Sequence, residues 1–183
     1  AQALRKHADF DVNRINEIEA EVRHDVIAFT TAVSEKMAAA GQAEHSRWLH
    51  YGLTSNDVVD TAQALVIRQA SEPISQGIEK FREVLKRRAW EFKDAVIVGR
   101  THGVHSEPTT FGLKLANWYA EVSRHATRFA EAREQIRVGK ISGAVGTFAH
   151  ISPAAEEKIC ERLGLIAAPI SSQVIQRDRH AHY

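Results

Sequence analysis

The segment 98–116 places histidines, hydroxyl groups, two glycines and a proline in one short stretch. His102 and His105 lie three residues apart in it. Imidazole is the side chain best suited to exchange a proton near neutral pH. The glycines permit close backbone approach, and Pro108 suits the first turn of the helix that we expect to follow. We therefore predict a loop at a helix start that presents a proton-transfer group.

Other interpretations of these histidines stay open. His102 and His105 could share a metal ion, but no cysteine or suitably spaced carboxylate accompanies them, which disfavours a metal site. A loop histidine without a function is a further alternative. His125 falls on the apolar side of a predicted helix, and we interpret it as a core residue.

A second polar cluster is the triplet Arg23, His24 and Asp25, which interrupts a helix face with three ionisable groups in succession. As a site it would supply a guanidinium fork for an anion, an imidazole and an orienting carboxylate. As an alternative, the triplet is a solvated turn of helix. The triplet alone does not separate the two interpretations.

A third cluster is the stretch 50–57, where Thr54 and Ser55 precede a predicted helix. Hydroxyls and free amides at a helix start can bind a carboxylate or phosphate, although a simple helix cap has the same pattern. Gln173 could bind a ligand, but its spacing is also that of a surface residue. The glycine-rich segment 139–147 matches neither common phosphate-binding fingerprint.

The composition limits the class of protein. The chain has 183 residues, 44% of them hydrophobic, and a formal net charge of +1. This balance provides no basic stripe for nucleic acid. The single cysteine, Cys160, fits a reducing compartment. No long apolar run or charged leader occurs, so we expect no membrane span and a cytoplasmic location.

The hydrophobic period predicts helices almost throughout, in an all-α fold. Apolar residues recur at steps of three and four in these segments: 15–37, 54–70, 73–92 and 109–138. Cap signals at Ser152 and Pro153, with Gly164 at the end, predict a short helix over 153–163. The run Ala95–Val98 could extend the third helix or run extended. Three long helices cannot cover one another's apolar faces, so we predict an oligomer built on a shared bundle.

Four strings of the chain, in collinear order, resemble the adenylosuccinate lyases of the fumarase/aspartase superfamily. They occupy residues 23–29, 50–61, 99–114 and 173–181. The resemblance implies an all-α, long-helix bundle that acts on small molecules without a cofactor. Members release fumarate from adenylosuccinate, giving AMP, and from SAICAR, giving AICAR, in purine biosynthesis. They work as homotetramers whose active sites form where three subunits meet.

The same resemblance assigns a role to each matching residue. His102 matches the catalytic histidine, usually the general acid, and Thr101 lies beside it. Thr54 and Ser55 match the pair that holds the succinyl part. The remaining matches are a nucleotide-binding triplet, in which His24 lies near the phosphate or helps catalysis, a substrate-binding glutamine, and a histidine placed in the site: Arg23, His24, Asp25, Gln173 and His50.

The chain also departs from the family pattern. The flexible signature loop that carries the serine base is absent, and so is an N-terminal Arg-Tyr that helps hold phosphate. We expect residues 1–53 to be the end of the first domain and 54–183 the first half of the central bundle. Such a fragment would lack catalysis alone. The alternatives are a sister lyase, such as argininosuccinate lyase, and a non-catalytic helical scaffold.

Overall fold

The computed structural model describes all residues, 1–183, and the chain is mostly helical, which confirms the predicted fold class. The chain divides into two compact units. The first unit consists of Ala1–Asp60, Lys140–Ile159 and Ala168–Val174. The second consists of Thr61–Gly139, Cys160–Ala167 and Ile175–Tyr183. No helix combines the length and the apolar character needed to cross a membrane.

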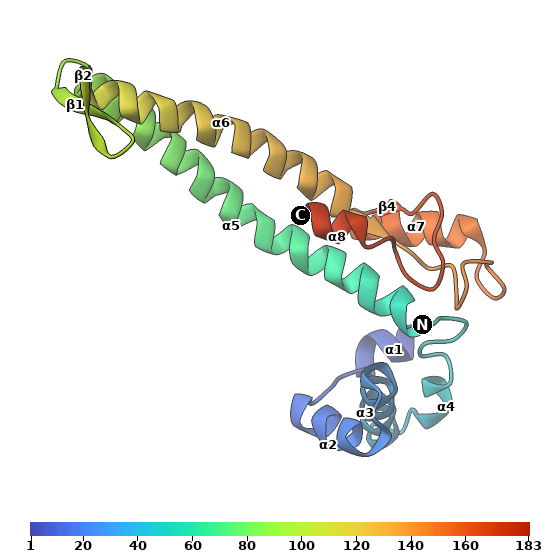
Figure 1. The fold of residues 1–183 in the computed structure, drawn as a ribbon. Coiled ribbons are helices and arrows are strands. Elements are labelled where there is room, and N and C mark those ends of the chain that lie inside the picture. Colours follow the sequence, from blue (N-terminus) through green and yellow to red (C-terminus); the bar gives the residue numbers. More distant parts are fainter. The chain divides into compact units, whose positions relative to one another are not determined.

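The helices and strands follow one another as Figure 1 labels them. The helices are α1 (Gln2–His7), α2 (Val12–Val22), α3 (Asp25–Ala39), α4 (Ala43–Ser46), α5 (Ser55–Glu91), α6 (Phe111–Ile136), α7 (Pro153–Leu163) and α8 (Asp178–His182). The strands are β1 (Val96–Thr101), β2 (Val104–Thr110), β3 (Val138–Gly139) and β4 (Ile166–Ala167). The short helix predicted over 153–163 is confirmed.

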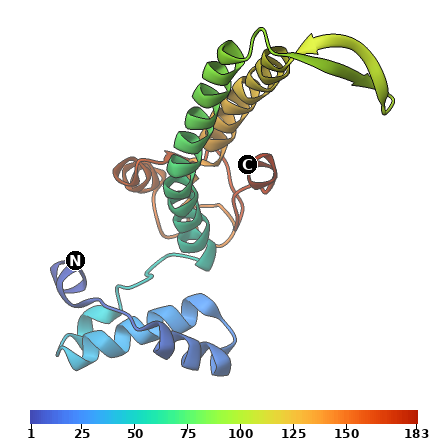
Figure 2. The ribbon, with the colours of Figure 1, turned by 90° about the vertical axis from the view of Figure 1, so that its left-hand side faces the viewer.

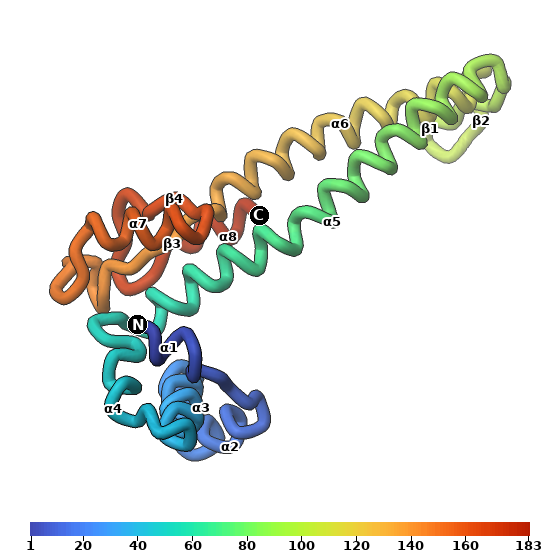
Figure 3. The backbone as a smooth tube through the Cα atoms, turned by 180° about the vertical axis from the view of Figure 1, so that it is seen from behind, coloured from blue at the N-terminus to red at the C-terminus, as the bar shows by residue number.

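In the first unit, α2 and α3 lie side by side, and α1 and α4 contact α3 (Figures 1 and 3). Ile18 of α2 packs on Ala28 and Ala32 of α3 in a small buried cluster. The single helix predicted over 15–37 is wrong, because α2 ends at Arg23, whose φ of 55° is left-handed. The apolar period continues across this break, so periodicity alone could not reveal it.

The helix α5 joins two segments that the sequence predicted as separate helices. It runs without interruption from Ser55 to Glu91 and contains Pro73. Proline has the φ of a helical residue, but inside a helix it removes one hydrogen bond and its ring crowds the carbonyl four residues earlier. The helix nevertheless continues through Pro73. The predicted helix start at Pro73 is therefore wrong.

In the second unit, α5 and α6 run side by side in opposite directions (Figures 1–3). Arg133 of α6 donates to the Ser75 hydroxyl, at 2.6 Å, and to the Glu72 carboxylate. Tyr183, just after α8, shares a hydrogen bond with Ser71 and contacts the ring of Phe129. These contacts join the three helices.

Much of the apolar surface of this helix pair is exposed. The exposed side chains include Val66, Ile74, Phe81, Val84, Trp90, Leu113 and Trp118. His125 is exposed as well and lies between Glu121 and Arg128 of its own helix, so its interpretation as a core residue is wrong. In a pair of helices, each helix covers only one face of the other. The remaining apolar faces of α5 and α6 are therefore exposed.

Most of the segment 98–116 lies in a β-hairpin at one end of the helix pair, and its last residues begin α6 (Figure 2). Strands β1 and β2 are antiparallel, with Val96 opposite Thr110 and Thr101 opposite Val104. The run Ala95–Val98 is therefore extended. Pro108 lies in β2 and not in the first turn of α6, so that prediction is wrong. The helix begins later because the Thr110 hydroxyl caps it, accepting from the Leu113 N–H.

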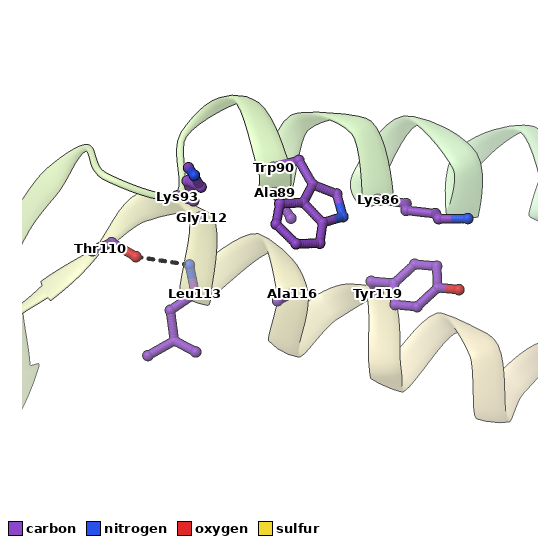
Figure 4. Close-up of a pocket in the computed structure, with 9 residues that line it drawn as sticks. All are labelled: Lys86, Ala89, Trp90, Lys93, Thr110, Gly112, Leu113, Ala116 and Tyr119. Carbon is purple, nitrogen blue, oxygen red and sulfur yellow. Dashed lines mark hydrogen bonds between the residues drawn. The ribbon is translucent and has the colours of Figure 1, made fainter.

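Gly112 sets how closely α6 starts beside the end of α5, as Figure 4 shows. A Cβ on Gly112 would lie 2.5 Å from the Ala89 carbonyl oxygen and 2.6 Å from the Lys93 Cα. Around this contact lies an open groove of about 440 Å³. Leu113 and Trp90 line its apolar surface.

Replacing Gly112 by alanine is expected to lower the free energy of unfolding by about 1–3 kcal/mol, since the obstructing atoms are backbone. The matched control is Gly77→Ala inside α5, where nothing lies within 4 Å of the added Cβ. That control should stabilise by about 0.5–1 kcal/mol. Urea unfolding of both variants checks the pair, and equal stabilities would contradict the close helix contact.

Candidate active site

Two recesses in the first unit collect most of the residues that the sequence predicts for a site. One, of about 280 Å³, is lined by His24, Val26, Ile27, Thr30, His50, Leu53, Thr54, Ser55 and Gln173. The other, of about 420 Å³, is lined by Glu19, Arg23, His24, Asp25, Ser55, Asn56 and Val59. They share His24 and Ser55, and we call them together the His24 recess.

His24 is the N-cap residue of α3 and also lines the recess. Its Nδ1 accepts a hydrogen bond from the Ile27 N–H at 3.4 Å, as a helix cap. The same Nδ1 lies 3.3 Å from a carboxylate oxygen of Asp25. His24 thus contacts both the first turn of α3 and the neighbouring carboxylate.

Backbone strain coincides with the predicted site. Positive φ occurs at four non-glycine residues: Arg23 (55°), His50 (61°), His102 (53°) and Phe148 (58°). Such conformations cost free energy and persist where the surroundings impose them, often at ligand sites. Three of these four residues are ones that the sequence predicts for the site.

His50 carries a further signal. Its Nε2 is buried and has no hydrogen-bond partner in the structure. An unpaired buried polar atom costs about 1–3 kcal/mol, unless a ligand or water satisfies it. His50 is one of the residues that line the His24 recess.

Thr54 and Ser55 lie at the start of α5, where backbone N–H groups have no partner within the helix. The Thr54 N–H donates to the Asp57 carboxylate at 2.9 Å. This is half of a capping box, in which the third helical residue reaches back to the cap. Ser55 lines both parts of the recess.

Asp57 and Lys140 are the polar residues that the sequence analysis missed. Their side chains are fully buried, and the Lys140 ammonium donates to Asp57 at 2.5 Å. Glu156 is buried nearby and accepts from the Ile141 N–H, and its burial raises the pKa of its carboxyl. The Thr54-x-x-Asp57 spacing was the one sequence signal for Asp57.

Thr101 and His102 belong to the second unit, where His102 and Gly103 form the tip of the β1–β2 hairpin. Both tip residues have positive φ, as a two-residue hairpin turn of type I′ requires. Thr101 and His102 are exposed. On β2, a hydrogen bond from the Ser106 hydroxyl lowers the pKa of Glu107. Nowhere do three His, Cys, Asp or Glu side chains gather as metal ligands.

The comparison with known protein families identifies the class of protein. The chain belongs to the lyase family, whose sequence model matches residues 1–183. This confirms the family resemblance of the four strings.

Two similar curated proteins are adenylosuccinate lyases. The adenylosuccinate lyase of Bacillus subtilis (strain 168) is 55% identical over 182 residues, which are 100% of this chain and 41% of that protein. The adenylosuccinate lyase of Staphylococcus saprophyticus subsp. saprophyticus is 55% identical over 180 residues, 98% of this chain and 41% of that protein. The chain thus spans about two fifths of the length of these relatives.

Solved structures with the same fold include other enzymes. The 3-carboxy-cis,cis-muconate lactonizing enzyme of Pseudomonas putida matches with a TM-score of 0.86 and 30% identity, over 94% of this chain and 40% of that one. The fumarate lyase of Mesorhizobium sp. BNC1 matches with a TM-score of 0.84 and 32% identity, over 98% and 42%.

Proposed function

We propose that this chain provides substrate-binding and acid-catalytic parts of an adenylosuccinate lyase. The reaction releases fumarate from adenylosuccinate, giving AMP, and from SAICAR, giving AICAR, in purine biosynthesis. One observation carries the proposal: the chain is 55% identical to an adenylosuccinate lyase along its whole length. Residues from three of the four matching strings line the His24 recess.

The succinyl end of the substrate is proposed to lie at the start of α5. The Thr54 and Ser55 hydroxyls and the first amides of the helix would bind its carboxylate, and the helix dipole favours negative charge there. During elimination, a base removes the proton on the carbon next to the C–N bond. The developing charge spreads into that carboxylate, so donors fixed at this point stabilise the transition state.

The nucleotide end is proposed to lie against the other residues of the His24 recess. Arg23 presents two parallel N–H donors, which match a phosphate. His50 would direct its unpaired Nε2 at a polar atom of the substrate. Asp25 and Gln173 would complete the hydrogen bonds, and His24 would contact the phosphate or assist proton transfer.

The acid is proposed to be His102, with Thr101 beside it. As the C–N bond breaks, its electron pair goes to the nitrogen, which His102 protonates, while the electrons of the broken C–H bond form the double bond of fumarate. The base comes from outside these residues. The exposed hairpin tip suits a group that serves a site on a neighbouring subunit.

A homotetramer in the cytoplasm completes the proposal. The exposed apolar side chains of α5 and α6 are the kind of surface that subunits of a shared bundle bury. The partners are small molecules, with no role for nucleic acid or a membrane. Residues 1–53 would complete a first domain, and 54–183 would be the first half of the central bundle.

Fumarate release tests the proposal directly. We expect the full reading frame that encodes this chain to release fumarate from adenylosuccinate and not from argininosuccinate. The 183-residue chain alone should be inactive, because it has the proposed acid but no base. Release from argininosuccinate would favour the sister lyase, and AMP binding without any turnover would favour the scaffold.

A further inference from the structure

We propose that Asp57 and Lys140 are positioning residues that hold the Thr54–Ser55 helix start and the Gln173 segment in register across the His24 recess. The inference rests on the proposed function only for the identity of the ligand. The network itself is a property of the first unit.

The Asp57 carboxylate joins two segments that are distant in the sequence. Its Oδ2 accepts from the Thr54 N–H at 2.9 Å. Its Oδ1 accepts from Lys140 Nζ at 2.5 Å and from the Ser142 N–H at 3.1 Å. The Gly143 N–H lies 3.3 Å from Oδ1 and 3.2 Å from Oδ2. One buried anion thus fixes the start of α5 to residues 140–143.

The same segment is fixed to the stretch that carries Gln173. The hydroxyls of Ser142 and Ser171 share a hydrogen bond of 2.7 Å. Gly146 has a φ of +80°, and a Cβ there would lie 2.0 Å from the Ser171 carbonyl oxygen. Only glycine allows this backbone approach. Since Gln173 follows two residues after Ser171, the position of residues 140–146 sets where Gln173 meets the recess.

Burial argues for positioning more than for stability. Both side chains are fully buried, and taking two charges out of water cancels most of their attraction. The pair instead fixes the orientation of the Asp57 side chain, because the ammonium and the backbone N–H groups can all donate to the carboxylate in only one arrangement. Lys140 also donates to the Gly143 carbonyl at 3.2 Å, which closes its own turn around the ion pair.

The test is a double-mutant cycle in the full reading frame with adenylosuccinate. Asp57→Asn keeps the shape and removes the charge, and we expect KM to rise at least about tenfold. The double variant with Gln173→Ala should have a KM no higher than that of the worse single variant. Both changes remove the same contact, the one between Gln173 and the substrate. Multiplying effects, or a KM within twofold of the parent, would overturn the inference.

Two further variants separate positioning from loss of fold. Ser142→Ala breaks the link to Ser171 without leaving a buried charge, and should raise KM about threefold to tenfold. Ser71→Ala removes a buried hydroxyl that bonds to Ile67 and Tyr183 in the other unit, so it should lower Tm with KM within twofold. A KM change for Ser71→Ala equal to that for Ser142→Ala would also contradict positioning.

Amide hydrogen exchange of the unliganded full-length protein makes the inference independent of the activity. Asp57→Asn should speed exchange at least about tenfold at residues 171–174 as well as at 54–57, whereas Ser71→Ala should leave 171–174 unchanged. Unchanged exchange at 171–174 in Asp57→Asn overturns the positioning role. If the parent protein released no fumarate, the proposed function would be overturned. The hydrogen-exchange result would still test whether Asp57 positions residues 171–174.

Discussion

Replacing His102 by alanine in the full reading frame is expected to lower kcat by about 10²–10⁴-fold, the usual contribution of a general acid. KM should stay within about threefold, since the proton moves only in the transition state. Steady-state fumarate release measures both constants. The matched control is His105→Ala, three residues further along the same exposed hairpin, which should keep kcat within twofold.

The backbone at His102 calls for a second variant. Its φ of 53° is left-handed, so alanine adds conformational strain to the loss of the imidazole. Asparagine tolerates this conformation but cannot transfer a proton. His102→Asn should therefore be as slow as His102→Ala. Parent-like turnover in the asparagine variant would remove His102 from the mechanism.

The second large effect is expected at Ser55. Ser55→Ala should weaken binding of adenylosuccinate about 10- to 150-fold, the equivalent of about 1.5–3 kcal/mol for a lost hydrogen bond to a charged group. Turnover should fall too, because the same carboxylate gains charge in the transition state. Calorimetric titration in a His102→Asn background measures the affinity without turnover.

A control for this variant is Ser46→Ala in α4. The Ser46 hydroxyl donates to the Ala43 carbonyl of its own helix and lines neither part of the His24 recess. Its affinity for adenylosuccinate should equal that of the parent. If Ser55→Ala also binds as the parent does, Ser55 does not hold the succinyl carboxylate.

The sequence predicted the helices well because their stability comes from apolar faces, whose period is visible in the residue order. It placed the helix breaks poorly. Arg23 adopts a left-handed conformation although it is not a glycine, and α5 continues through Pro73, where a proline usually kinks or ends a helix. The hairpin was hidden for a related reason. The tip uses His102 and Gly103 where Asn-Gly is the usual signal.

The candidate site was predictable in its members but not in its geometry. Residue types and the family resemblance selected Arg23, Thr54 and Gln173, yet nothing in their spacing places them around one recess. Contacts between Asp57 and Lys140 join residues 83 positions apart, and such pairs leave no local pattern. Short sequence motifs indicate which residues can do chemistry, whereas the relative positions of distant segments depend on tertiary packing.

The exposed apolar side of the α5–α6 pair has a practical consequence. Trp90, with 71% of its surface exposed, lies in it and contributes to the open groove beside Gly112. An indole in water emits at longer wavelength than one packed against protein. The chain therefore carries its own fluorescent reporter on the surface where we propose that subunits meet, and no label is needed to follow when that surface becomes covered.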